Sequence, residues 1–267
     1  MQRKNFRPKK NRIRKKASEK PDYQSAKLQT TSEKSDGIRL NKYIANSGVC
    51  SRREADKLIE SGQITADNKP IKELGFKVKP GVVIRYNKRV LKPEKLVYLL
   101  LNKPKGFITT TTDPDGRKTV MDLIKNACEE KVFPVGRLDR VTTGLLLFTN
   151  DGELAKKLTL PTHKIKKIYQ VELNKPISKN DFESIANGVK LDDGIAHVDD
   201  LAIVSEDGKV LGIEIHLGKN RIVRRIFEHL GYQVEKLDRV AYGELTKKDL
   251  PRSNWRFLTE KEALWLK

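Results

Sequence analysis

One short segment, Gly136-Arg137-Leu138-Asp139-Arg140, combines residue types that could perform chemistry. It lies between two apolar stretches that predict strands, so its carboxylate stands at a strand end. Because nearby positive charge favours the ionised form of an acid, Arg137 and Arg140 should keep Asp139 charged. An ionised aspartate can act as a nucleophile. The same pattern is common in turns and surface ion pairs, so the motif alone does not establish a catalytic site.

Two later segments could serve the same site. In the predicted strand 168–173, Tyr169 shares a face with apolar residues, so its ring should point inward, either for packing or as a platform for an extruded base. The predicted helix 221–230 has a clear apolar stripe, and segment 216–220 before it would offer free backbone N–H groups to a phosphate. The arginines on the opposite, solvated face of this helix are Arg221, Arg224 and Arg225.

A second carboxylate, Asp151, leaves glycosidic hydrolysis by paired carboxylates as a rival interpretation. It ranks low, since Asp151-Gly152 is typical of a turn that joins a strand to a helix. The two cysteines, Cys50 and Cys128, lack the spacing of a zinc or redox site. We therefore expect no metal site and a reduced, cytoplasmic protein.

The elements that must position these residues are mostly strands. They do not alternate regularly with helices, which predicts an α+β fold with a mostly antiparallel sheet. The strands are predicted at 97–101, 107–112, 133–135, 145–149, 168–173, 201–204 and 210–217, and the helices at 179–187 and 221–230.

The N-terminal part of the chain has a different character. Residues 1–37 hold 12 basic and 4 acidic side chains and few apolar ones, which predicts a disordered basic arm that contacts phosphates. Order begins at Ile38 with a helix that ends at Gly48. Ser51 and Glu54 then form a capping box that opens a second helix. Short strands follow, so residues 38–95 should form a compact module.

The formal net charge of +20 favours a polyanionic partner. No apolar run approaches the roughly 18 residues needed to cross a bilayer, and none near Met1 resembles a secretion signal. We therefore expect no association with membranes.

The stretch from Arg39 to Ile71, RLNKYIANSGVCSRREADKLIESGQITADNKPI, resembles the S4 RNA-binding module. Its most specific part is GVCSRREA. The resemblance implies docking on structured RNA through phosphate contacts. The residues expected to bind RNA on this module are Arg39, Lys42, Arg52, Arg53 and Lys57.

Four further motifs resemble, in order and spacing, the RNA pseudouridine synthases, and specifically the branch that modifies ribosomal RNA and carries an N-terminal S4 module. The resemblance spans residues 38–267 and implies an S4-like module followed by a catalytic domain, residues 96–267, built on a mostly antiparallel mixed sheet with flanking helices. The motifs are YLLLNKPKG from Tyr98, GRLDRVTTGLLLFTNDG from Gly136, KKIYQVEL from Lys166 and GKNRIVRRIFEHLGY from Gly218.

The resemblance also implies roles for single residues. Asp139 would be the catalytic nucleophile, Tyr169 would stack on the target base and help to move its C5 proton, and Arg224 would pair with Asp139. The residues implied to support the catalytic loop are Arg137, Leu138, Thr143 and Lys103. RNA contacts beside the site are expected from Lys219, Arg221 and Arg225.

The implied reaction is the isomerisation of uridine to pseudouridine in ribosomal RNA, on a nucleotide flipped out of its stack. It involves no redox change or net hydrolysis, so we expect no cofactor. The loop from Asp113 to Val120 resembles the large-subunit synthase B type, with the F type as the runner-up. The alternatives are a small-subunit synthase and a catalytically inactive S4-type factor of ribosome assembly. We expect a monomer.

Overall fold

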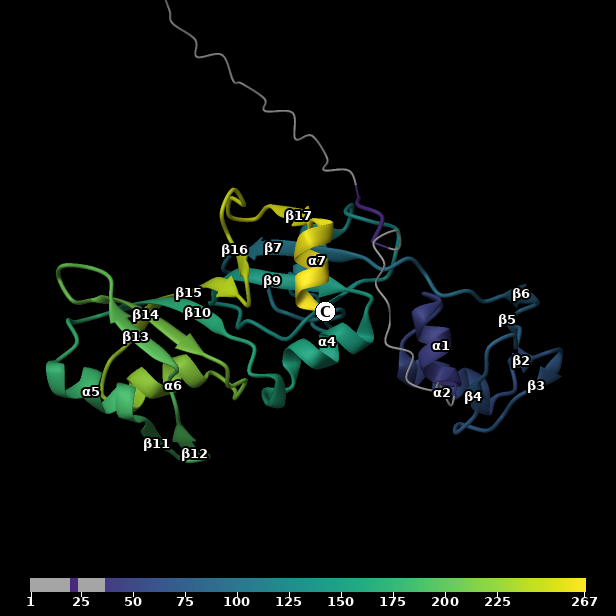
Figure 1. The fold of residues 1–267 in the computed structure, drawn as a ribbon, viewed down its shortest axis with the longest axis horizontal. Coiled ribbons are helices and arrows are strands. Elements are labelled where there is room, and N and C mark those ends of the chain that lie inside the picture. The colour runs from purple at the N-terminus through teal and green to yellow at the C-terminus, as the bar shows by residue number, and fades with distance from the viewer. Residues whose placement is uncertain (1–19, 24–36) are drawn as a thin grey trace, which may run out of the picture.

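The computed structural model describes residues 20–23 and 37–267 (Figure 1). A small N-terminal module lies at one end, and a larger unit built around a single sheet makes up the rest. Within the described residues, no helix is long and apolar enough to cross a membrane.

The N-terminal module packs two helices, α1 (Leu40–Asn46) and α2 (Arg52–Glu60), against short strands. The predicted capping box is present: Oγ of Ser51 accepts from the Glu54 N–H, and the Glu54 carboxylate accepts from the Ser51 N–H. The strands form the pair β1 (Ile38–Arg39) with β4 (Lys77–Val78), and the sheet β3 (Lys69–Pro70), β2 (Ile64–Ala66), β5 (Ile84–Tyr86) and β6 (Arg89–Val90). The apolar core of the module is drawn from residues 40–91 alone.

The larger unit is built on a sheet that contains nine strands among the described residues. All pairings between its strands are antiparallel except β15 with β9, which are parallel, so the predicted mostly antiparallel mixed sheet is confirmed. The main path runs β13 (Asp200–Ile203), β14 (Val210–Ile215), β10 (Lys167–Leu173), β15 (Val234–Tyr242), β9 (Thr143–Thr149), β7 (Tyr98–Lys103) and β17 (Trp255–Phe257); β16 (Leu245–Thr246) pairs with β15, and β8 (Phe133–Pro134) with β9.

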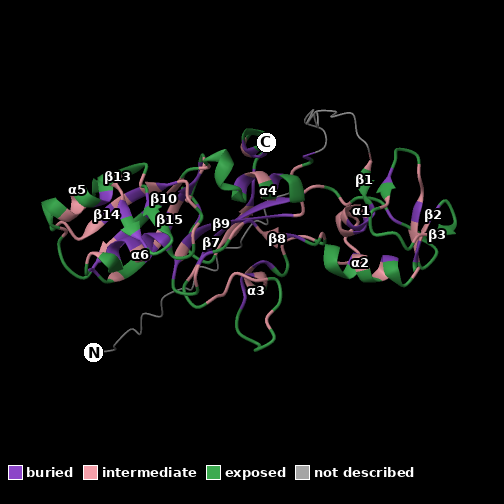
Figure 2. Cartoon of the chain, turned by 90° about the horizontal axis from the view of Figure 1, so that it is seen from below, coloured by how far each residue is buried: buried purple, intermediate pink, exposed green. Residues whose placement is uncertain are grey.

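Helices cover both faces of this sheet. One apolar cluster joins the sheet to α3 (Val120–Ile124), α5 (Lys179–Asn187) and α6 (Ile222–His229). The other joins it to α4 (Gly152–Thr159) and α7 (Glu260–Leu266). Side chains alternate along the central strands, and Figure 2 shows β7 and β9 as buried throughout most of their length. The short helix η1 (Pro161–His163) and the hairpin β11 (Val189–Leu191) to β12 (Gly194–Ala196) complete the unit.

The predicted strand 107–112 is wrong. This segment is irregular, and only Ile108 forms an isolated bridge, with Thr119. Threonines favour strands, but here their hydroxyls make other contacts: Oγ1 of Thr110 donates to the nearby Thr112 carbonyl oxygen at 2.7 Å, and Oγ1 of Thr109 bonds to Leu138. The longest strand, β15, was not predicted, because charged residues interrupt its apolar pattern.

The predicted disordered arm is wrong for residues 20–23, and the rest of that prediction, for residues 1–19 and 24–36, lies outside the described residues. Tyr23 is only 2% exposed. Its hydroxyl donates to the carbonyl oxygen of Leu258 at 2.6 Å, and its ring meets the Tyr98 ring edge-on at 4.9 Å. Tyr23, together with an ion pair between Lys20 and Glu130, therefore anchors this segment to the larger unit, where composition alone indicated no order.

Candidate active site

A cavity of about 430 Å³ opens where the loop that bears Asp139 meets the sheet and the start of α6. Its walls come from residues 135–142, from β10 and β15, and from the segment that leads into α6. Six of the residues predicted from the sequence line it together: Arg137, Leu138, Asp139, Tyr169, Lys219 and Arg221. The sequence motifs therefore converge on one concave site.

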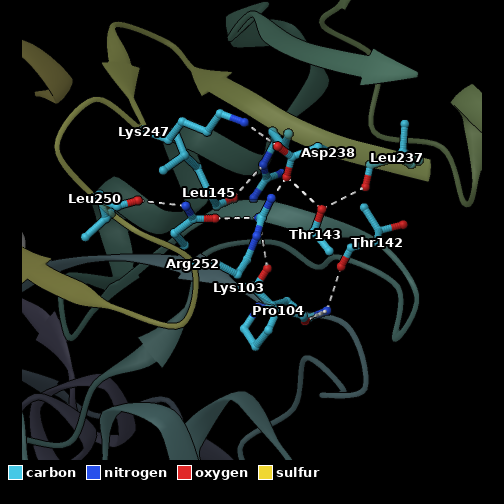
Figure 3. A network of polar contacts seen from close by, with 12 residues as sticks. Lys103, Pro104, Thr142, Thr143, Leu145, Leu237, Asp238, Lys247, Leu250 and Arg252 are labelled. Atoms are coloured by element: carbon cyan, nitrogen blue, oxygen red, sulfur yellow. Dashed lines mark hydrogen bonds and ion pairs between the residues drawn. The ribbon is translucent and has the colours of Figure 1, made fainter. Parts of the chain in front are cut away.

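Lys103 anchors the loop from below. Its side chain is completely buried at the end of β7. Its Nζ donates to the carbonyl oxygens of Asp139 at 3.0 Å, Thr142 at 2.7 Å and Pro104 at 3.2 Å, as Figure 3 shows in part. Burial lowers the pKa of Lys103 to about 8, although the Asp139 charge opposes this. Lys103 thus holds the backbone of the loop and leaves the Asp139 carboxylate free for the cavity.

Thr109 holds the loop from the other side, and the sequence did not single it out. Its Oγ1 donates to the carbonyl oxygen of Leu138 at 2.7 Å and accepts from the Leu138 N–H at 3.2 Å. The backbone of Leu138, the residue before Asp139, is therefore hydrogen-bonded through both its N–H and its carbonyl oxygen. The Thr-rich run was the only available signal, and it predicted a strand instead.

Asp238 fixes the strand that follows the loop (Figure 3). It accepts from Oγ1 of Thr143 at 2.7 Å and from Nη1 of Arg252 at 2.8 Å, and it also pairs with Lys247. Burial alone would raise the pKa of Asp238, but the hydrogen bonds from Arg252, Lys247 and Thr143 outweigh it and lower the pKa. Thr143 does not line the cavity, so it acts on the site through the start of β9.

Tyr169 lies on β10 in the cavity wall and is 8% exposed. It pairs across the sheet with Ile213 on one side and Arg239 on the other. The predicted inward orientation of its ring is confirmed by its place in the apolar core.

Arg221, and not Arg224, is the basic residue beside Asp139. Nη1 of Arg221 lies 3.9 Å from Oδ2 of Asp139. Nη1 of Arg224 donates instead to the carbonyl oxygen of Val234 at 2.9 Å, and no ion pair joins Arg224 to Asp139 in the described structure. The expectation that Arg224 lies on a solvated helix face is wrong: the side chain is 7% exposed because the start of β15 covers it.

Two predicted RNA contacts beside the site are already paired. Arg225 forms a two-pronged ion pair with Asp193, at 2.7 and 3.0 Å. Nζ of Lys219 donates to the Asp193 carbonyl oxygen at 2.7 Å. The hydrogen bonds from Arg225 lower the pKa of Asp193 to about 2. The loop of the β11–β12 hairpin thus holds both cations, of which Lys219 lines the cavity.

The predicted RNA-binding residues of the N-terminal module lie apart from this cavity. Arg39, Arg52, Arg53 and Lys57 are exposed. Nζ of Lys42 pairs with Oε1 of Glu153 at 2.6 Å and so joins α1 to α4. A second cavity, of about 1320 Å³, lies between the module and the larger unit; its basic lining residues are Lys42, Arg52, Arg53, Lys125, Lys131 and Lys156.

The paired-carboxylate interpretation fails on geometry. Asp151 caps α4 by accepting from the Leu154 N–H, and it accepts from the Tyr98 hydroxyl at 2.9 Å. It does not line the Asp139 cavity. Among the residues that the structure describes, no cluster of three or more histidine, cysteine, aspartate or glutamate side chains could hold a metal ion.

The sequence did not single out three other residues that line the cavity, namely Lys167, Arg239 and Tyr242. Arg239 is 3% exposed, an unusual degree of burial for an arginine. Lys167 and Tyr242 pair with each other across β10 and β15.

Comparison with known proteins gives two family matches, an S4 domain over residues 38–84 and an RNA pseudouridylate synthase domain over residues 97–229. The ribosomal large subunit pseudouridine synthase B of Bacillus subtilis is 39% identical over 229 residues, which cover 84% of this chain and 93% of that protein. The dual-specificity RNA pseudouridine synthase RluF of Escherichia coli is 37% identical over 231 residues, covering 85% and 77%. A crystal structure of a pseudouridylate synthase matches with a TM-score of 0.62 at 27% identity, over 86% of this chain and 100% of that one.

Proposed function

The chain belongs to the RNA pseudouridine synthases, and from this premise we propose that it converts uridine to pseudouridine in large-subunit ribosomal RNA with Asp139 as the catalytic carboxylate. One observation carries the proposal. Asp139 and Tyr169 line a single cavity of about 430 Å³, a volume in the usual range of small-ligand sites. A flipped-out nucleotide placed there would meet both residues.

The chemistry accounts for the residue types. The N1–C1′ bond of uridine breaks, the uracil turns, and C5 bonds to the same ribose carbon. Asp139 can attack the nucleotide or remove a sugar proton, and both routes need an ionised carboxylate next to the ribose. Flipping the base costs a few kcal/mol, and stacking on Tyr169 offsets part of that cost.

We propose that two arginines share the role that the resemblance gives to one. Arg221 supplies the direct ion pair with Asp139. Arg224 supplies a buried positive charge behind it: burial lowers the pKa of Arg224, and the Asp139 charge acts in the opposite direction. Arg137, Leu138, Thr143 and Lys103 then support the loop.

The N-terminal module is proposed to dock on folded ribosomal RNA. We place the division between the two domains at residues 95 and 96, supported by the separate apolar core of residues 40–91. The large subunit is favoured because the Bacillus subtilis relative is named for it. The relative of dual specificity supports a second candidate, an enzyme that also modifies another RNA. We propose that the protein acts as a monomer.

Chemical mapping of pseudouridine in ribosomal RNA from cells that lack this protein tests the proposal. We expect one or a few sites in the large-subunit RNA to lose pseudouridine. The wild-type gene should restore them, as should an Asp200→Asn control, whose carboxylate is exposed on an edge strand. Asp139→Asn should not. Unchanged ribosomal RNA would overturn the choice of substrate, and full activity of Asp139→Asn would overturn the role of Asp139.

A further inference from the structure

The cavity that holds Asp139 has a buried cation deep in its wall. Arg239 lines it with only 3% of its surface exposed. Its Nε donates to the carbonyl oxygen of Leu145 at 2.7 Å, and its guanidinium lies 4.7 Å from the centre of the Tyr242 ring. Nη2 is buried without a hydrogen-bond partner in the described structure. A buried donor that lacks a partner is costly, and an acceptor that a ligand places beside this guanidinium would offset part of that cost.

Strand pairing places Arg239 beside the ring that a flipped base would meet. Arg239 on β15 lies directly opposite Tyr169 on β10, so both side chains leave the same face of the sheet. On its other side, Arg239 pairs with Gly144 of β9. A Cβ atom at Gly144 would lie 2.3 Å from the carbonyl oxygen of Arg239, so only glycine permits this close approach. The Asp139 loop, which leads into β9, is thereby held next to Arg239.

A second cation, Lys167, faces the same interior. It lies two residues before Tyr169 on β10, and both line the cavity. Its Nζ donates to the carbonyl oxygens of Ile165 at 3.1 Å and His216 at 2.8 Å, which leaves one of its three donors without a partner among the described residues. Burial and then the charge of Arg239 lower the pKa of Lys167 to about 8.

Depth separates these two cations from the arginines at the mouth. Arg137 and Arg221 are exposed, as suits contacts with the phosphates of an RNA chain. Arg239 lies in the interior, where the base of a flipped nucleotide enters and its phosphates do not. Uracil carries two carbonyl oxygens that accept hydrogen bonds, whereas cytosine has an amino donor in place of one of them.

We propose that the Arg239 guanidinium binds a carbonyl oxygen of the flipped-out uracil and, together with Lys167, stabilises the negative charge that the ring gains when the N1–C1′ bond breaks. This inference rests on the proposed function. The electron pair of the broken bond passes to the uracil ring, where it spreads over N1, O2 and O4. The pair returns when C5 bonds to C1′, C5 loses its proton and N1 gains one. Arg239 transfers no proton; its fixed charge acts as a preorganised stabiliser.

Replacing one atom of the RNA at a time tests the contact. The substrate is an RNA fragment that contains the mapped target uridine. In two variants of this RNA, sulfur replaces O2 or O4 of the target uracil, because sulfur accepts hydrogen bonds weakly. Single-turnover rates are measured for the wild type, Arg239→Met and Arg239→Lys. Arg256→Met serves as a matched control, because it removes a part-buried arginine paired with Glu262 outside the cavity.

At one of the two positions, sulfur should slow the wild type by about 10- to 100-fold, the range of a hydrogen bond to a charged group. Arg239→Met should be slowed by a similar factor on the oxygen RNA and little further by sulfur, so the two effects are not additive. The single-turnover rate of Arg239→Lys should lie between those of the wild type and Arg239→Met. Arg256→Met should respond to sulfur as the wild type does.

Additive effects at both positions would overturn the contact, even if Arg239→Met is less stable, since a folding defect slows both RNAs equally. A further RNA carries an uncharged phosphate analogue and no sulfur. If its effect on the rate and the effect of Arg239→Met were not additive, Arg239 would contact the RNA backbone, and the proposed contact with uracil would be overturned. The wild-type rate on unmodified RNA reports the proposed function separately, so failure of one idea is distinguishable from failure of the other.

Discussion

Nζ of Lys103 lies 2.7 Å from the carbonyl oxygen of Thr142, wholly buried beneath the loop that presents Asp139. A flexible, strongly hydrated side chain is thus used as a fixed support. It donates to the carbonyl oxygen of Pro104, just after β7, and to those of Asp139 and Thr142 in the loop, which has no regular secondary structure of its own.

Replacement of Lys103 should lower both the stability of the fold and the rate of the reaction. Lys103→Met leaves the carbonyl oxygens of Asp139 and Thr142 without their donor, so we expect a loss of about 3 kcal/mol in the free energy of unfolding. Urea denaturation measures this loss. Lys190→Met, on an exposed position of β11, should stay within about 0.5 kcal/mol of the wild type. An unchanged stability of Lys103→Met would show that the three contacts contribute nothing.

The pH dependence of stability follows from the same residue. Its folded pKa of about 8 lies below the value of 10.5 in the unfolded chain. Between these values the unfolded state binds more protons, so the free energy of unfolding of the wild type relative to Lys103→Met should rise as pH increases from 8 to 10.5. Denaturation of both proteins at several pH values measures it, and a constant or falling difference would contradict the assignment.

The Asp238 cluster should act on the rate more than on RNA binding. Asp238→Asn removes a carboxylate that accepts from Thr143 and Arg252, so the start of β9 should loosen. We expect a stability loss of about 3 kcal/mol, with kcat lowered about 10-fold and KM for RNA little changed. Thr143→Val, which removes one donor only, should show a smaller change in the same direction. An increase in KM alone would place Asp238 in RNA binding instead.

Asp193 pairs with Arg225 and Lys219, so removing its charge should strengthen nonspecific attraction to RNA. Asp193→Asn removes the carboxylate that pairs with Arg225 at 2.7 Å and lies 3.5 Å from Nζ of Lys219, so both cations become available to phosphates, although Lys219 keeps its hydrogen bond to the backbone carbonyl oxygen. The slope of log affinity against log salt should steepen by about 1. Titrations at several salt concentrations measure this slope, with Asp200→Asn as the control for charge alone. Equal slopes for the two variants would mean that Arg225 and Lys219 do not reach the RNA.

The Tyr23 side chain should contribute about as much to the free energy of unfolding as an aromatic residue of the core. Tyr23→Ala removes a buried ring that packs on Tyr98, so we expect a stability loss of about 3–5 kcal/mol. Tyr23→Phe keeps the ring and loses only the hydroxyl, which donates to the carbonyl oxygens of Leu258 and Tyr98, so it should cost about 1 kcal/mol. Thermal unfolding compares the two. A negligible effect of Tyr23→Ala would show that the segment is not held in solution.

The sequence predicted the parts of the site that follow local rules. The loop around Asp139 stands between apolar strands, and Tyr169 follows from the alternation of a strand, so both could be located by pattern. Arg224 was misplaced because helical periodicity describes α6 alone, whereas β15 covers its far side. Arg239 was missed for a related reason: β15 mixes charged and apolar residues, and nothing local reveals which charges turn inward.

The parallel pair of β15 and β9 also joins two blocks of the sheet, each of which carries one of the proposed catalytic residues. Only Asp238 and Arg239 of β15 pair with Thr143 and Gly144 of β9. The Asp139 loop belongs to the block of β9, β7 and β17, and Tyr169 to the block of β13, β14, β10 and β15. The proposed nucleophile and the proposed stacking residue therefore come from different blocks of the sheet, and one apolar cluster with residues from both blocks holds them together. Their relative position therefore depends on the packing of that cluster as well as on the few residues that pair across β15 and β9.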